Sequence, residues 1–223
     1  MLFAKGLSPR LSDNLSKKKE TSRHIINKKA NLKLDYVVKK CKVALGLYIE
    51  KSVERFLERE VTFCYLRFLT KLNLKYKVEN RLWAISYDLL YNTVIEDRFL
   101  AGPESDCLFD VRLKGKLKIK DAEFVSDSND KRVLEILEKL NNPLITERIS
   151  SMDLTNFKIS YRKDTRLWKV NFRSLIGSTT WNFIPPVTYL IKPKEEECVK
   201  IVELFELIGD ALVRPQQENS TLI

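Results

Sequence analysis

A chain of 223 residues that is 44% hydrophobic and 31% charged has enough apolar material for a core, which excludes a wholly disordered protein. Its longest mostly apolar stretch, residues 174–191, contains Asn182 and two prolines and is therefore a poor membrane span. The net charge of +10 is concentrated in residues 1–43, which hold 12 Lys or Arg against 3 Asp or Glu. The rest of the chain is nearly neutral, and such asymmetry is typical of a protein with a polyanionic partner.

Residues 1–33 predict a basic arm that is flexible until it binds, because their apolar residues are sparse and lack helical spacing. Two interpretations stay open for this arm. It contacts nucleic acid, a ribonucleoprotein or an anionic membrane surface, or it is a targeting segment, since its first dozen residues are basic and free of acid. The candidate polyanion-binding residues of the arm are Lys17, Lys18, Lys19, Arg23, Lys28 and Lys29.

Apolar residues at spacings of three and four predict a helix over residues 34–60. Residues 74–91 favour strand, and Gly102-Pro103 marks a break. Residues 111–120 alternate strictly between apolar and basic side chains, with glycine once in the apolar row, which predicts a strand with one wet face. The wet face would carry five basic residues: Arg112, Lys114, Lys116, Lys118 and Lys120. They would either bind the phosphates of a polyanion or prevent edge-to-edge aggregation of the sheet.

The second half of the chain predicts a helix over about 130–140, a hairpin around residues 163–165, a third strand near 179–184 and a last helix from about Pro193. Trp83, Trp168 and Trp181 are expected in the core. Strands in consecutive runs favour an α+β fold, with one mostly antiparallel sheet packed against about three helices. The expected organisation is the arm at 1–33, one domain over 34–213 and a polar tail at 214–223.

Known catalytic and cofactor motifs are missing from the sequence. Its six glycines are too far apart for a phosphate-binding loop. The single histidine, His24, lies in the arm, which excludes a Ser-His or Cys-His site in a folded pocket. Four scattered cysteines without metal-ligand spacing predict free thiols in a reducing, intracellular compartment, with no metal and no cofactor.

Paired carboxylates are the remaining route to catalysis. Glu96, Asp97, Asp106 and Asp110 flank the break at 101–106 and would need to converge in space for general acid–base work. The sequence favours a non-enzymatic binding or assembly protein that docks to protein partners and whose arm contacts nucleic acid or a ribonucleoprotein. The alternatives are an organelle-imported or peripheral membrane-surface protein, and a cofactor-free enzyme that uses carboxylates.

Overall fold

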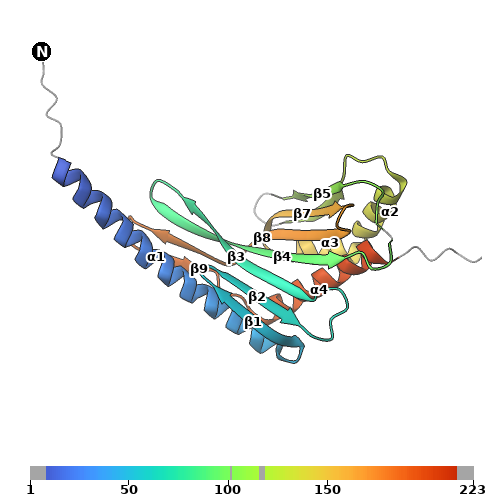
Figure 1. The fold of residues 1–223 in the computed structure, drawn as a ribbon, viewed down its shortest axis with the longest axis horizontal. Helices are drawn as coiled ribbons and strands as arrows, with labels where there is room; N and C mark the ends of the chain where they lie inside the picture. The colour runs from blue at the N-terminus through green and yellow to red at the C-terminus, as the bar shows by residue number, and fades with distance from the viewer. Residues whose placement is uncertain (1–8, 101, 116–118, 215–223) are drawn as a thin grey trace, which may run out of the picture.

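The computed structural model of the protein describes residues 9–100, 102–115 and 119–214, with side chains placed from His24 onward except at residue 47. It contains one antiparallel sheet of nine strands with α-helices packed on one face (Figure 1). The predicted α+β fold is confirmed, although the described residues form four α-helices rather than about three. The helices are α1 (Pro9–Ala44), α2 (Lys131–Leu140), α3 (Pro143–Ser150) and α4 (Glu195–Val213).

The strands follow one another in the sheet in the order β1-β2-β3-β4-β8-β7-β5-β6, and β9 pairs with the far end of β8. Every neighbouring pair of these strands is antiparallel. Their bounds are β1 (Ile49–Arg55), β2 (Glu58–Phe63), β3 (Lys71–Asn80), β4 (Ala84–Glu96), β5 (Cys107–Lys114), β6 (Asp121–Val125), β7 (Leu154–Arg162), β8 (Leu167–Asn182) and β9 (Thr188–Leu190).

Helix α1 changes the expected organisation of the N-terminal region. Its 36 residues begin at Pro9, where proline is tolerated in a first turn. Ile26, Ala30 and Leu34 recur every four residues on one side of it and are buried in the core. The predicted flexible arm is therefore wrong for residues 24–33, because apolar burial and tertiary packing order a segment whose composition alone looked too polar. The expected boundary at residue 33 falls inside this helix.

The helix predicted over residues 34–60 ends at Ala44 instead. A short 3₁₀ turn (Gly46–Tyr48) leads into β1, which forms a tight hairpin with β2. The turn residue Leu57 has a positive φ of 57°, and its backbone amide donates to Asn31 Oδ1 on α1 at 2.8 Å. The apolar spacing of this segment fits a helix, but it fits a strand equally well. Hydrogen bonding between β1 and β2 and the contact of Leu57 with α1 favour the strands.

The sheet curves around α1. This helix contacts β2 and β8, which lie on either side of the β3–β4 pair in the sheet (Figure 1). Gly177 in β8 permits the close approach, since its φ is +82° and a Cβ there would lie 2.5 Å from Leu89 Cδ2 and 3.3 Å from Val37 Cγ1. A larger residue would collide with Leu89 of β4 and make a tight contact with Val37 of α1.

The basic strand predicted over residues 111–120 is wrong in its second half. Strand β5 ends at Lys114, and Gly115 follows with a φ of 135° that an L-residue rarely adopts. The chain then turns back, so that Lys114 pairs with Asp121 at the start of β6. Val111, Leu113 and Ile119 still pack against the core as expected.

Other parts of the second half match the expectations closely. Helix α2 begins after Asp130, whose carboxylate accepts hydrogen bonds from the amides of Arg132 and Val133, and α4 begins near Pro193. The hairpin of β7 and β8 is present, but the expected third strand is the continuation of β8 itself. Trp168 is fully buried and Trp181 half-buried, whereas Trp83 is 60% exposed at the β3–β4 turn, so its expected core position is wrong.

Candidate functional site

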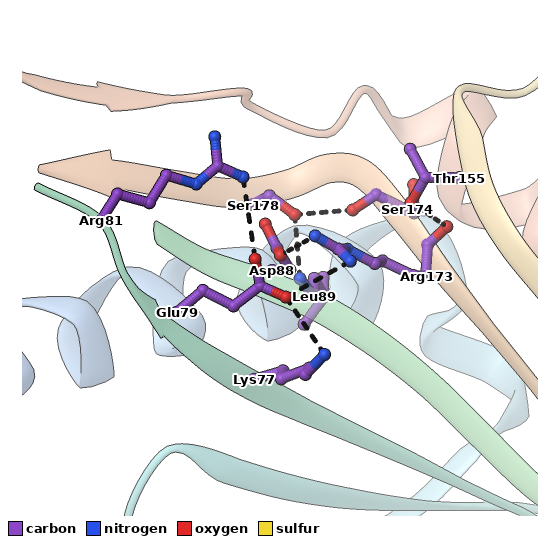
Figure 2. Close-up of polar contacts among 9 residues, drawn as sticks. All are labelled: Lys77, Glu79, Arg81, Asp88, Leu89, Thr155, Arg173, Ser174 and Ser178. Atoms are coloured by element: carbon purple, nitrogen blue, oxygen red, sulfur yellow. Dashed lines mark hydrogen bonds and ion pairs between the residues drawn. The ribbon is translucent and has the colours of Figure 1, made fainter. Parts of the chain in front are cut away.

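The sheet face opposite the helices is polar, and ion pairs join its central strands. Figure 2 shows Arg173 of β8 pointing toward Asp88 of β4 and Glu79 of β3. The guanidinium bonds the Asp88 carboxylate and lies 3.5 Å from Glu79 Oε1. Lys77 Nζ and Arg81 Nη2 approach the Glu79 carboxylate at 3.1 and 3.7 Å. The hydrogen bond from Lys77, and then the charge of Arg173, lower the pKa of Glu79.

This cluster marks a place where the regular strand pairing is interrupted. The register between β4 and β8 shifts between Tyr87 and Leu89. Ser178 Oγ accepts from the Leu89 amide at 2.9 Å and donates to the Ser174 carbonyl at 2.6 Å, so a side chain replaces a missing backbone partner (Figure 2). The arrangement stabilises the bend in the sheet.

A groove of about 910 Å³ lies on the same polar face, farther along the strands. Its floor includes apolar side chains of β4, β8 and the turn after β4: Leu90, Val94, Phe99 and Leu167. Its cations are mostly paired, since Lys71 lies 3.8 Å from Glu60, Lys75 3.4 Å from Glu58 and Arg98 3.4 Å from Glu96. Lys169 has no ion-pair partner in the described part of the chain. The groove has the size of a small-molecule site, and its charges largely compensate one another.

The four carboxylates considered for catalysis do not form one site. Glu96 pairs with Arg98, and Asp110 lies 3.1 Å from Lys158. Asp97 is buried and accepts hydrogen bonds from the Gly102 amide at 2.8 Å and from Tyr161 Oη at 3.4 Å, which closes the 97–102 turn.

Asp106 accepts from the Lys163 amide and from Arg162, and these bonds lower its pKa. Asp106 and Asp110 share the wall of a hollow of about 220 Å³, yet each is held by its own cation. All four act as structural anions in this arrangement. Among the described residues, no group of three or more His, Cys, Asp or Glu side chains is arranged to hold a metal ion.

The predicted polyanion-binding residues are placed in two regions. In the strand region, Arg112 and Lys114 are exposed on β5, Lys114 pairs with Asp121 at 3.3 Å and with Glu123 at 3.4 Å, and Lys120 precedes β6. Lys116 and Lys118 lie outside the described residues. The prediction of a single strand carrying all five cations is therefore wrong, because β5 ends at Lys114 and Lys114 is paired with two acids of β6.

The arm residues are all carried by α1. Lys28 and Lys29 are exposed, and Lys29 Nζ lies 4.9 Å from the centre of the Trp181 ring. Lys17, Lys18, Lys19 and Arg23 belong to the same helix, although their side chains lie outside the described set. Residues 9–44 hold eleven Lys or Arg and three Asp or Glu, so this helix carries most of the net charge of the protein.

Sequence reasoning missed that the exposed side of α1 is also apolar. Ile25, Leu32, Tyr36 and Val43 are 51%, 61%, 36% and 63% exposed, on a helix whose other side is buried. The signal was present in the sequence as spacings of seven, four and seven residues. A boundary at residue 33 separates Ile25 and Leu32 from Tyr36 and Val43, so neither part alone shows the row.

Residues 49–212 match the family described as "Protein of unknown function (DUF3156)". The chain belongs to the DUF3156 family. The match runs from the start of β1 to the last turn of α4, so α1 precedes the matched residues. No curated protein and no solved structure matches the chain. Within the part of the chain that the structure describes, no helix combines the length and the apolar character needed to cross a membrane.

Proposed function

We propose that this DUF3156 protein is a non-enzymatic binding protein that docks on a polyanionic surface through α1. The observation that supports the proposal is the exposed side of this helix. Lys28, Lys29 and Lys39 are exposed there, and none of the three has an ion-pair partner among the described residues. Cations without ion-pair partners on a rigid element bind an anionic surface with little loss of ion pairs or of backbone entropy.

The length of the helix strengthens this proposal. Its 36 residues span about 54 Å at 1.5 Å per residue. Figure 1 shows the N-terminal part of α1 extending beyond the end of the sheet, so a partner can reach it without contacting the body. Nucleic acid, a ribonucleoprotein and an anionic membrane all offer the negative charge that such a helix requires.

The test replaces the three exposed lysines in the variant K28E/K29E/K39E and measures retention on a heparin column. A matched control, K131E/K163E/K192E, changes the net charge equally on three exposed lysines outside α1. We expect the α1 variant to elute at clearly lower salt than the wild type, and the control to elute close to it. The salt dependence of binding to a heparin oligosaccharide should also weaken, with a log–log slope smaller by on the order of three.

Circular dichroism and thermal unfolding establish that both variants fold. If the two triple variants shift elution equally, net charge rather than α1 determines binding and the proposal is wrong. An α1 variant that elutes together with the wild type would also contradict the proposal.

A further inference from the structure

We infer that the surface on which α1 docks is an anionic lipid bilayer, with the helix lying in the interface and its outward apolar side inserted. This inference rests on the proposed function and names its partner. It is carried by an apolar stripe, defined as Ile25, Leu32, Tyr36 and Val43, which points away from the body of the protein.

The direction of the stripe follows from helix geometry. At about 100° per residue, Leu32, Tyr36 and Val43 lie within about 20° of Ile25 around the helix axis. The buried residues from Ile26 to Val38 are centred about 150° away on the same scale. The helix thus has two apolar sides, one in the core and one facing solvent over about 27 Å of its length. Exposed apolar side chains aligned along one side of a helix favour an interaction site.

Lysines border the stripe on both sides. On the helical scale, Lys28 and Lys39 lie about 60° and 40° to one side, and Lys29 and Lys40 lie about 40° and 60° to the other. On that second side, Lys29 Nζ lies 4.9 Å from the centre of the Trp181 ring and Lys40 Nζ lies 4.0 Å from Glu195 Oε1. Asp35, the acid of this part of the helix, is engaged with the buried Arg59 at 2.6 Å. An apolar row between two rows of lysines is the pattern of a helix that lies at a membrane surface, where the lysine stems run along the apolar boundary and their ammonium groups reach lipid phosphates.

The same charges disfavour other occupants. A second copy of the chain docked stripe to stripe would bring rows of lysines against each other, and like charges beside a helical seam oppose pairing. Nucleic acid would satisfy the lysines but would leave four exposed apolar side chains without a partner. A bilayer with anionic headgroups satisfies both the charges and the apolar row.

The test compares vesicle binding with heparin binding. Wild-type protein is sedimented with vesicles of phosphatidylcholine alone and of phosphatidylcholine with phosphatidylglycerol. We expect binding to the anionic vesicles only, weakened by salt. The variant L32S/V43S should lose about tenfold or more of this binding while it keeps its retention on heparin. The control L134S/L144S, which alters two exposed leucines on α2 and α3, should bind vesicles as the wild type does.

The outcomes separate the two proposals. If the wild-type protein is retained on heparin but does not bind anionic vesicles, the bilayer is not the partner. The proposed docking of α1 on a polyanion is then unaffected. Unchanged vesicle binding by L32S/V43S overturns insertion of the stripe. A self-associated wild-type protein in sedimentation velocity, reduced to monomer by L32S/V43S, shows that a second copy covers the stripe. Loss of affinity of L32S/V43S for a DNA duplex, with no binding of the wild type to vesicles, assigns the surface to nucleic acid.

Discussion

At the scale of single residues, the contact between Cys41 and Cys198 joins the two longest helices. Their sulfur atoms lie 2.8 Å apart between α1 and α4. The hydrogen bond between the two sulfur atoms lowers the pKa of Cys198 and raises the pKa of Cys41. The four cysteines are free thiols in the structure. Because these two are separated by 157 residues, no sequence pattern could have paired them.

We expect a mild oxidant such as diamide to join Cys41 and Cys198. The two thiols would give one disulfide, and diamide would take up their two hydrogens. The disulfide would close a loop of 157 residues and so reduce the entropy of the unfolded chain. This effect raises the free energy of unfolding by at most about 5 kcal/mol. Peptide mapping under non-reducing conditions identifies the bond, and thermal unfolding measures the gain.

The variant C107S, which leaves the pair intact, is the control and should oxidise as the wild type does. The variant C198S should gain no stability in diamide. A disulfide that maps to Cys64 or Cys107, or an oxidised wild type without higher stability, would contradict this prediction.

At the scale of elements, α1 shows why composition alone misplaced the N-terminal boundary. Its polar and basic residues resemble a disordered segment, yet every fourth residue from Ile26 is buried. Asn27 Oδ1 accepts from Tyr87 Oη at 2.6 Å, and Asn31 Oδ1 accepts from the Leu57 amide. The partners of these two hydrogen bonds are separated by 60 and 26 positions in the sequence. Only the folded sheet brings them together.

A pair of truncations tests this assignment. Deletion of residues 1–33 removes Ile26 and Ala30 from the core along with both asparagine hydrogen bonds, and should lower the free energy of unfolding by on the order of 3–5 kcal/mol. Deletion of residues 1–23 leaves these contacts intact and should change stability by less than about 1 kcal/mol. Urea unfolding measures both proteins. Equal stability of the two truncated proteins would show that residues 24–33 are not part of the domain.

The other elements divide by the kind of signal that defines them. Local signals predicted α2 and α4, because apolar residues recur at helical spacing in both. A proline also precedes α4 and three glutamates begin it. They also predicted the β7–β8 hairpin and the presence of one mostly antiparallel sheet. Residues 45–60 were misassigned since their apolar spacing fits helix and strand alike, and pairing between strands decides such cases. On α1, the sequence alone shows which residues are basic, and their role stays a prediction. The outward apolar stripe required knowledge of which side of α1 is buried.

At the scale of the whole molecule, α1 lies on one face of the curved sheet (Figure 1). Most residues that line the polar groove belong to strands and face the other side, although Val213 of α4 also lines it. The side of α1 that faces solvent therefore points away from the groove. A protein docked through α1 would leave the groove, with Lys169 on β8, turned to the aqueous side. Docking and occupation of the groove would then be independent events, because neither surface covers the other.

This orientation predicts where the protein contacts lipid. An environment-sensitive fluorophore is attached to Leu32→Cys or to Lys169→Cys, each in a C64S/C107S background that retains the pair Cys41 and Cys198. On anionic vesicles that contain a lipid-borne spin label, the fluorophore at position 32 should shift to shorter wavelength and be quenched, because it enters the apolar boundary. The fluorophore at position 169 should keep the spectrum it has in water. Quenching at both positions, or at 169 alone, would mean that the sheet face and not α1 meets the membrane.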